Sequence, residues 1–415
     1  MKKACIISVG NELLSGRNVD TNASYFSREL LALGIPAAGF YTVGDDVGSI
    51  AETIKSAAQK ADIVLITGGL GPTDDDVTRY GLAKFLGSEL QFSEELFRQI
   101  SEYFDNRKYE MPEKNRIQAS IPAGAEGLTN NEGTAPGIMA LKDDTMVISL
   151  PGVPVEAKRM FAESVADRIA ELGASEVVIT KRLKCFGVGE STIAEMLGDL
   201  MSRKRNPLIN CTVSGGVITL YIIANSKRRR QAEEMIEKDA VKLHGILGDF
   251  VYGSEEQTMA EVVGKQLAEK KLKLALAESC TGGLIAKMIT DTAGASEYFR
   301  TGWVTYSNQA KVEQLGIDEE LIEKNGAVSS EVAEAMAEAA KQKAGADISV
   351  AVTGIAGPGG GSADKPAGLV YIAVNMGRNT VVQRYVFSGK REYIRKRTAL
   401  TALNIVRIGL LEQKT

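Results

Sequence analysis

A serine and a lysine in the last third of the chain are the residue types best suited to covalent chemistry. Ser279 follows the apolar run LKLALAE, which is typical of a buried strand, and precedes a helix predicted to begin around Gly282. The start of a helix offers free backbone N–H groups and partial positive charge, which can hold an oxyanion and activate a hydroxyl. Ser279 is therefore a candidate nucleophile. The competing interpretation is that Ser279 and Thr281 only cap this helix.

The candidate base is Lys311, because the chain contains a single histidine. That residue, His244, lies far from any segment with catalytic character, which argues against a Ser-His-Asp triad or a multi-histidine metal site. Lys311 stands in GWVTYSNQAK with Tyr306 and Asn308, after another predicted strand. Because strand ends meet at one edge of a sheet, we expect the Ser279 hydroxyl and the Lys311 amine to converge. A desolvated lysine can then act as the base, although Lys311 alone also fits a surface position.

Two further C-terminal segments have phosphate-binding character. The run AVTG ends at Gly354 and enters a loop with five glycines between Gly354 and Gly361, where backbone can approach a phosphate or ribose closely. In FSGKREYIRKR, Arg391 and Arg395 are four residues apart on the first turns of a predicted helix and could grip a phosphate. Glycine-rich loops are common, so the loop is weak evidence without the arginines.

A second constellation lies near the N-terminus, in DIVLITGGLGPTDDDVT. Gly68, Gly69 and Gly71 follow a predicted central strand, where they permit backbone approach to a pyrophosphate, and the aspartates beside them can recruit a divalent cation. A Walker A loop is excluded because no GK[ST] follows. The competing interpretation is a tight turn with acidic helix capping by Asp74 and Asp75.

The elements that would position these side chains follow from the hydrophobic pattern. Up to about residue 170, short β-branched runs alternate with amphipathic stretches, which is the βαβ signature of a parallel sheet covered by helices. Residues 174–252 fit a small α+β module, and a polar stretch at 253–256 fits a linker before a further α/β region. Because 415 residues exceed one core, we expect three domains, at residues 1–172, 173–253 and 254–415.

Composition limits the cellular setting and the partners. Four scattered cysteines without a CxxC pattern suit free thiols in a reducing compartment, and the opening MKKACIISVG fits a first strand rather than a signal peptide. No segment approaches the ~20 apolar residues of a membrane span. A net charge of -4 argues against a nucleic-acid partner, and the basic clusters at 203–205 and 227–230 are interpreted as solvated. We therefore expect a cytoplasmic protein without membrane contact.

Taken in order, the four C-terminal segments resemble the nicotinamide mononucleotide deamidase domain of the CinA family over residues 256–415. The resemblance implies that Ser279 attacks the carboxamide carbon, that Lys311 acts as base, and that Tyr306 assists proton transfer or orients the ring. Ammonia would leave, water would release nicotinate mononucleotide, and no cofactor would be needed. Lys390 departs from the family pattern, in which many relatives carry aspartate in a GDR motif, so Arg391 lacks one expected partner. The implied substrate-binding residues are Thr281, Gly282, Gly283, Asn308, Thr353, Gly354, Gly357, Arg391 and Arg395.

The N-terminal segments GNELLSG, VDTN, GDD, NEGTAPG and LPGVPVE, with the glycine loop, resemble the Rossmann-like molybdopterin-binding fold of molybdenum cofactor synthesis proteins and CinA proteins. In the CinA setting this implies cleavage of ADP-ribose to AMP and ribose 5-phosphate with Mg, Mn or Co, with Asp46 and Asp76 as metal ligands. The same scaffold could instead bind a nucleotide or pterin without hydrolysis. The implied nucleotide-binding residues are Glu12, Asn22, Asp46, Gly68, Gly69, Gly71, Asp75, Asp76, Thr134, Pro151 and Gly152.

The middle module resembles the KH-like domain of the same family. A KH domain that binds RNA needs a GxxG loop between two helices, but the one such string here, at 245–248, is predicted to end a helix and enter a strand. We therefore expect a connector with a structural or dimer-forming role, and the family resemblance implies a homodimer. Two other functions stay open: a serine–lysine amidase acting on peptides, which the phosphate-directed residues argue against, and a non-catalytic accessory role in competence or recombination.

Overall fold

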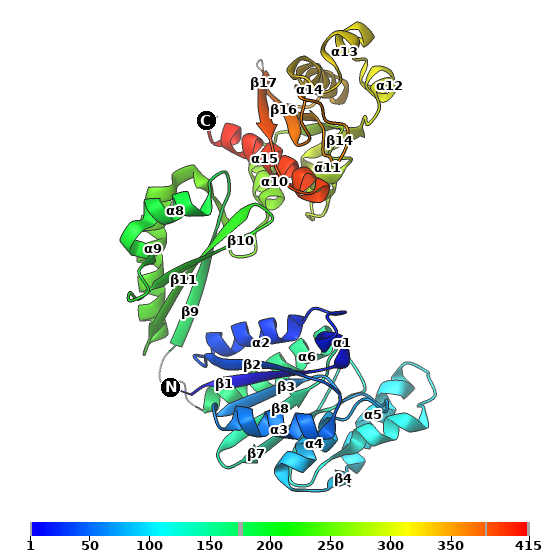
Figure 1. The fold of residues 1–415 in the computed structure, drawn as a ribbon, viewed down its shortest axis with the longest axis vertical. Coiled ribbons are helices and arrows are strands. Elements are labelled where there is room, and N and C mark those ends of the chain that lie inside the picture. Colours follow the sequence, from blue (N-terminus) through cyan, green and yellow to red (C-terminus); the bar gives the residue numbers. More distant parts are fainter. Residues whose placement is uncertain (1, 173–176, 378–379, 413–415) are drawn as a thin grey trace. The chain divides into compact units, whose positions relative to one another are not determined.

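The computed structural model describes residues 2–172, 177–377 and 380–412 (Figure 1). Its contacts separate two compact units, one of residues 1–180 with 224–235 and one of residues 181–223 with 236–415. Both contain helices packed on sheets with parallel strands, which confirms the predicted α/β class. The expected boundary between residues 172 and 173 meets residues 173–176, which lie outside the described residues. The three-domain division stays a prediction.

The first unit is built on a six-stranded sheet with the order β2-β1-β3-β8-β7-β6. Pairing is parallel from β2 through β8 and antiparallel for β7 and β6. Strands β1 and β3 are buried along their whole length, as expected for central strands covered on both faces. The strand bounds are β1 Ala4–Val9, β2 Ala37–Val43, β3 Ile63–Thr67, β6 Glu126–Leu128, β7 Gly137–Lys142 and β8 Thr145–Leu150.

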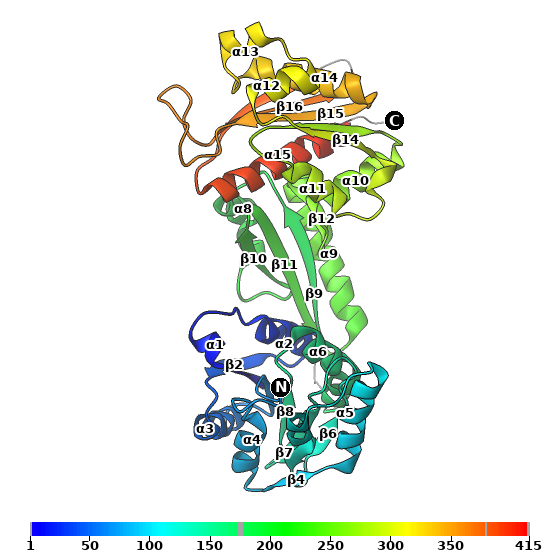
Figure 2. The same cartoon turned by 90° about the vertical axis from the view of Figure 1, so that its right-hand side faces the viewer.

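Helices cover both faces of this sheet (Figures 1 and 2). One face is packed by α2 (Thr21–Ala32), α6 (Pro154–Met160) and α7 (Ala166–Glu171), with a π-helical turn, η2 (Phe161–Val165), joining the last two. The other face is packed by α3 (Val47–Ala58) and α4 (Thr78–Leu86). The remaining elements are α1 Asn11–Leu14, β4 Leu90–Phe92, α5 Glu94–Asn106, the 3-10 helix η1 Glu113–Ala119 and β5 Ser120–Pro122.

The middle module contains a four-stranded sheet with the order β10-β11-β9-β12. Its long helix α9 ends at Leu247, and a 3-10 turn leads from Gly248 into β12, so the GxxG string at 245–248 does not form a loop between two helices. The bounds are β9 Val177–Cys185, α8 Glu190–Leu197, η3 Gly198–Met201, β10 Leu208–Ser214, β11 Val217–Ser226, α9 Arg229–Leu247, η4 Gly248–Phe250 and β12 Val251–Ser254.

The C-terminal region has a five-stranded sheet with the order β14-β13-β15-β16-β17. The central strand β13 runs parallel to both neighbours, β14 and β15, whereas β16 and β17 are antiparallel additions. In a parallel arrangement, the carboxyl ends of the strands meet at one edge. The bounds are β13 Leu274–Glu278, β14 Phe299–Val304, β15 Ile348–Gly354, β16 Leu369–Met376 and β17 Thr380–Val386.

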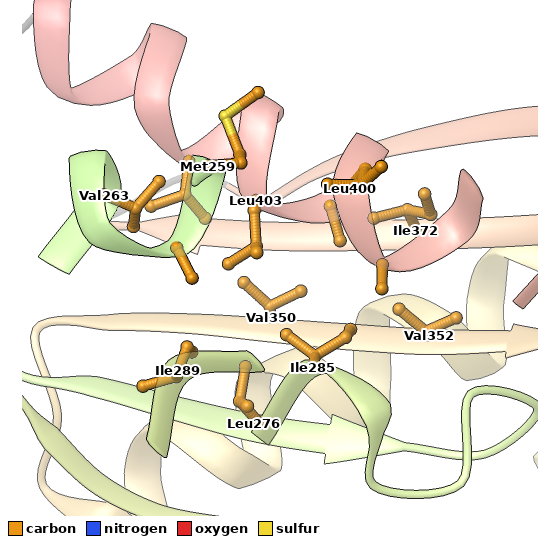
Figure 3. Packing of buried hydrophobic residues seen from close by; sticks show 14 of the residues in the cluster. Met259, Val263, Leu276, Ile285, Ile289, Val350, Val352, Ile372, Leu400 and Leu403 are labelled. Atoms are coloured by element: carbon orange, nitrogen blue, oxygen red, sulfur yellow. The ribbon is translucent and has the colours of Figure 1, made fainter. Parts of the chain in front are cut away.

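Two helical layers enclose the C-terminal sheet (Figure 2). Figure 3 shows the core beneath one layer, in which Leu276, Val350 and Ile372 of the sheet pack against Ile285 of α11 and Leu403 of α15. The opposite face packs against α14 and its neighbours. The helical bounds are α10 Met259–Glu269, α11 Leu284–Thr290, η5 Ala295–Glu297, α12 Asn308–Ala310, the π-helical turn η6 Lys311–Leu315, α13 Glu319–Asn325, α14 Ser330–Ala344 and α15 Arg391–Glu412.

The register of the three parallel strands fixes what stands at their carboxyl edge. Glu278 pairs with Val304 on one side and Val352 on the other. The residues that follow are therefore neighbours: Ser279 after β13, Thr305 after β14, and Thr353 near the end of β15, all of them buried. Among the described residues, no helix combines the length and the apolar character needed to cross a bilayer.

Candidate active sites

The hydroxyl of Ser279 and the amine of Lys311 lie side by side at the edge of the C-terminal sheet. Lys311 Nζ is 3.2 Å from Ser279 Oγ, although 32 residues separate the two in the chain. Strand β13 carries the serine to the edge, and the lysine is the first residue of η6, on the face opposite α11. Their side chains are 7% and 1% exposed. The structure brings the two predicted groups together in a buried position.

Three oxygen atoms surround the Lys311 amine, and its burial favours the neutral form. Besides the Ser279 hydroxyl, Nζ lies 3.0 Å from the carbonyl oxygen of Thr305 and 3.5 Å from that of Ser307. A neutral amine has two N–H donors and one lone pair, so it can donate to both carbonyls and accept the hydroxyl proton. Burial lowers the pKa of the Lys311 ammonium, and the nearby Cys280 offsets this only in part. The pair therefore has the chemistry of a nucleophile and its base.

The helix after the nucleophile differs from the predicted one. It begins at Leu284 rather than near Gly282, and its N-cap, Gly283, receives no side-chain hydrogen bond. Ser279 and Thr281 therefore do not cap it, which removes the competing interpretation of the serine. Gly282 and Gly283 have φ values of 58° and 86°, a left-handed conformation that glycine adopts without strain, and together they form the turn between strand and helix.

A buried carboxylate occupies the start of α11. Glu278, which is 1% exposed, accepts hydrogen bonds from the backbone N–H groups of Ile285 and Ala286 at 3.1 and 2.8 Å. The helix start is thus neutralised from inside and cannot hold an oxyanion, contrary to our expectation. The backbone amides of Cys280, Thr281 and Gly283 have no hydrogen-bond partner in the described part of the chain, so the loop itself offers the donors.

The two arginines of α15 hold backbone around the dyad. Arg395 donates from Nε and Nη2 to the Thr281 carbonyl at 3.2 and 2.6 Å. Arg391 donates to the Gly357 carbonyl at 2.8 Å and to the Tyr306 hydroxyl at 2.9 Å. These bonds tie the loops that follow β13, β14 and β15 to one helix. A guanidinium has five N–H donors, so both side chains retain some for a ligand, and their contact with phosphate stays a prediction.

The other predicted residues of this site are placed in different ways. Tyr306 is 61% exposed and its hydroxyl meets an arginine rather than the dyad, while Asn308 is an exposed residue at the start of α12. Thr353 is fully buried, and its hydroxyl donates to the Ala327 carbonyl at 2.7 Å. A Cβ on Gly354 would lie 2.7 Å from a carbonyl oxygen of β16, so no side chain fits there. Their contact with a nucleotide stays a prediction.

A cavity of about 410 Å³ lies at the carboxyl edge of the N-terminal sheet. A neighbouring cavity of about 290 Å³ shares Glu12, Gly68 and Gly152 with it and adds Asn22, whose amide donates to Thr67 and to the Gly152 carbonyl. The structure therefore gathers residues from several distant segments, as expected for a ligand site at this edge. The predicted residues that line the larger cavity are Glu12, Gly68, Gly69, Gly71, Asp75, Asp76, Thr134, Pro151 and Gly152.

Asp46 is not among the residues that line either cavity, which corrects one prediction. Its carboxylate accepts hydrogen bonds from the Ser49 N–H and hydroxyl at 2.7 and 2.8 Å and forms the N-cap of α3. The same bonds hold the pKa of Asp46 below its ordinary value. Its neighbour Asp45 lines the larger cavity instead. The Asp46 carboxylate caps the start of α3, so the structure gives no support for a metal site that includes Asp46.

The aspartates after the glycine loop are placed to meet a cation together with a ligand. Asp76 accepts hydrogen bonds from the Thr73 N–H and hydroxyl at 2.9 and 2.7 Å, and Asp75 also accepts from that hydroxyl. Neither Asp74 nor Asp75 caps α4, whose N-cap is Val77. No group of three or more acidic, cysteine or histidine side chains in the described residues could hold a metal. Because Mg²⁺ is often held by one or two carboxylates plus substrate phosphates, these residues fit a cation that binds with a nucleotide.

Comparison with known proteins places the chain in a family. Models of a probable molybdopterin binding domain, the damage-inducible protein CinA KH domain and the CinA C-terminal domain match residues 5–171, 180–253 and 256–410. A competence-damage inducible protein of Caldicellulosiruptor bescii is 40% identical over 407 residues, covering 98% of this chain and 99% of the relative. One from Thermoanaerobacter pseudethanolicus is 43% identical over 406 residues, covering 98% of each. The chain belongs to the CinA family.

The family match confirms the order of the three segments in this CinA protein, whereas the relatives' names state no reaction. Sequence reasoning missed several residues at the two CinA sites. Glu278 was detectable as a charge ending an otherwise apolar strand, an unusual position for glutamate. Arg79 is 2% exposed on α4, but a lone arginine beside three aspartates gives no such signal. Asp45 was hidden by its neighbour Asp46.

Proposed function

We propose that the C-terminal site hydrolyses the carboxamide of nicotinamide mononucleotide to nicotinate mononucleotide and ammonia. The observation that carries the proposal is the 3.2 Å approach of the buried Lys311 amine to the Ser279 hydroxyl. Lys311 Nζ takes the hydroxyl proton as Ser279 Oγ attacks the carboxamide carbon. The same proton then passes to the leaving nitrogen, and the C–N bond breaks with release of ammonia.

Water completes the reaction by attacking the serine ester. Lys311 Nζ takes a proton from that water, the ester bond breaks, and the proton returns to Ser279 Oγ, which leaves a carboxylic acid that ionises. Negative charge develops on the carbonyl oxygen in both halves of the reaction. In the described part of the chain the amides of Cys280, Thr281 and Gly283 have no hydrogen-bond partner, and we assign these loop donors to this charge.

The surroundings of the dyad favour a nucleotide substrate over a peptide. Arg391 and Arg395 frame the loops beside it and retain N–H donors for a phosphate, and Tyr306 offers an exposed ring near Arg391. A peptide substrate has no phosphate to engage these cations. The arginines therefore make the phosphate-bearing amide the better-supported substrate class.

An ammonia-release assay on the full-length protein tests this proposal. We expect release from nicotinamide mononucleotide by the wild type and its loss in Ser279→Ala. Ser101→Ala is the matched control, because that hydroxyl contacts only the Phe97 carbonyl within α5 and the Met111 sulfur, both in the N-terminal unit. Ammonia release from a peptide amide, but not from nicotinamide mononucleotide, would support the peptide-amidase alternative instead. Release by Ser279→Ala at the wild-type rate would remove the serine from the mechanism.

For the N-terminal site we propose cleavage of ADP-ribose to AMP and ribose 5-phosphate with a divalent cation. The supporting observation is the cavity of about 410 Å³ whose wall combines the glycine loop with Asp75 and Asp76. The cation would supply charge neutralisation for water attack on the pyrophosphate. A metal titration with Asp76→Asn tests the site, with Asp46→Asn as the control, because Asp46 lines neither cavity and asparagine can keep the N-cap of α3. Equal activity of wild type and Asp76→Asn would contradict it.

A non-catalytic accessory role remains compatible with the family. It predicts that cells carrying Ser279→Ala behave like the wild type. The enzymatic proposal predicts that these cells behave like cells that lack the ammonia-releasing activity. The homodimer and the cytoplasmic location stay predictions, which sedimentation and cell fractionation would test.

A further inference from the structure

The glycine loop of the N-terminal cavity has all four of its carbonyl groups fastened to the start of α4. The Thr78 hydroxyl donates to Gly68 O at 2.8 Å, and the Thr78 amide donates to Gly69 O at 3.0 Å. Arg79 Nη2 donates to the next two carbonyls, those of Leu70 and Gly71, at 2.5 and 2.9 Å. Two consecutive residues therefore hold four consecutive carbonyls toward the protein interior.

The peptide geometry then determines where the loop amides face. In a trans peptide the C=O of one residue and the N–H of the next point in opposite directions. The inward carbonyls of Gly68, Gly69 and Leu70 therefore turn the next three N–H groups outward, whereas the Gly71 carbonyl is followed by Pro72, which has no N–H. The three outward groups are the amides of Gly69, Leu70 and Gly71, and none of them has a hydrogen-bond partner in the described part of the chain. All three residues line the cavity. Successive free amides of this kind form a concave surface for an anion.

Side chains alone would make this cavity repel an anion. Its wall contains five carboxylates and no lysine or arginine; the carboxylates are Glu12, Asp45, Asp75, Asp76 and Glu156. A positive charge lies behind the loop, because Arg79, which bonds the Leu70 and Gly71 carbonyls, is 2% exposed. Arg79 makes no ion pair with a described residue, and Asp76 is the acid whose charge it chiefly feels. A buried charge without an ion pair is costly, so its retention calls for a function.

We propose that Arg79 is a positioning residue that creates a phosphate site from backbone amides. It fixes the inward carbonyls, and its buried charge adds to the positive potential at the exposed N–H groups. The ligand class is a phosphate or pyrophosphate group, as in a nucleotide, rather than an uncharged nucleoside. This inference rests on the proposed nucleotide chemistry of the N-terminal cavity.

The test compares ligands that differ only in phosphate. Calorimetric titration of the full-length protein in Mg²⁺ buffer would measure the affinities for AMP, adenosine, ADP-ribose and inorganic pyrophosphate. We expect the wild type to bind AMP more tightly than adenosine. Arg79→Met should reduce that preference about tenfold or more, because it removes a charged donor from two carbonyls. Arg79→Lys, which keeps the charge but loses the fork, should fall between the two.

A matched control uses Arg407, which is buried to the same degree as Arg79. Arg407 is also 2% exposed and donates to a backbone carbonyl, that of Asp249, in the second unit. Arg407→Met therefore removes a comparable buried guanidinium and should leave the preference for AMP over adenosine unchanged. If Arg79→Met does not fold, Arg79→Lys and Thr78→Val carry the test, since Thr78→Val releases only the Gly68 carbonyl and should reduce the preference less.

The outcomes separate this inference from the proposed function. An equal loss of AMP and adenosine affinity in the Arg79 variants would make Arg79 a structural residue and overturn the inference. Wild-type binding of pyrophosphate but not ADP-ribose would overturn the proposed nucleotide function while leaving the role of Arg79 measurable with pyrophosphate. Binding of neither ligand would overturn both.

Discussion

The glycine loop at residues 68–71 and the serine loop at residues 279–283 are both turns from a central parallel strand into a helix, but the charges behind them have opposite signs. Arg79 takes the carbonyls of the first loop and leaves its amides free. Behind the second loop, Glu278 accepts from the Ile285 and Ala286 amides in the first turn of α11. The first turn is therefore prepared for an anion, whereas the second depends on a neutral amine. Similar backbone turns acquire different chemistry from one buried side chain each.

The largest expected effect comes from removing the amine on which the second turn depends. Lys311→Met should lower ammonia release about 10²- to 10⁴-fold, the usual contribution of a general base. The side chain keeps its length and loses only the group that accepts the Ser279 proton. Lys341→Met is the control, since Lys341 donates to backbone and to Asn375, which pairs with Ser349 at the start of β15, away from the edge that holds Ser279. If Lys311→Met released ammonia at the wild-type rate, the claim that the serine loop depends on a neutral amine would be wrong.

A smaller effect should follow from changing the charge behind the serine loop. Glu278→Gln leaves one carbonyl oxygen to serve two N–H groups, so we expect unfolding to become easier by about 1–3 kcal/mol. The displaced loop should lower kcat about tenfold with little change in KM, because the chemistry and not the phosphate contact is disturbed. Glu261→Gln makes the same change in the exposed capping box of α10. An unchanged kcat in folded Glu278→Gln would reduce Glu278 to a stabilising role.

The smallest effect is expected at the outer contact of the C-terminal site. Tyr306→Phe removes the hydroxyl that accepts from Arg391 but keeps the ring. The donor is a charged guanidinium, but Tyr306 is exposed, so we expect this hydrogen bond to contribute about 0.5–1.5 kcal/mol and kcat/KM to fall about two- to tenfold. A loss as large as that in Lys311→Met would show that the tyrosine itself transfers protons, which is the other role the family resemblance allows.

Much of the fold and part of the dyad geometry followed from the sequence. Apolar strands ending in polar residues at Ser279 and before Lys311 predict a shared sheet edge, because parallel strands end together. The helix start was misplaced because Gly282 and Gly283 extend the turn to Leu284. Sequence spacing gives no information on where a buried side chain points, so the partners chosen by Glu278 could not be predicted.

The choice between two adjacent aspartates shows the same limit at the N-terminal site. Asp46 and Ser49 have the spacing of a helix N-cap, and this local signal was available in the sequence. The family resemblance points to Asp46 as a metal ligand, whereas Asp45 lines the cavity. The three inward carbonyls that free the loop amides depend on Thr78 and Arg79 reaching back to the loop, and such contacts exist only in the folded chain.

The most direct test of the central claim is the pH dependence of ammonia release from nicotinamide mononucleotide. Burial lowers the pKa of Lys311, and only its neutral form can accept the Ser279 proton, so the rate should rise with pH through a pKa below that of ordinary lysine. The unfolded chain holds more protons on Lys311 in that window, so stability should rise with pH as well. Lys311→Met should lose both dependences. A wild-type rate that is independent of pH, or a Lys311→Met profile identical to it, would contradict the account.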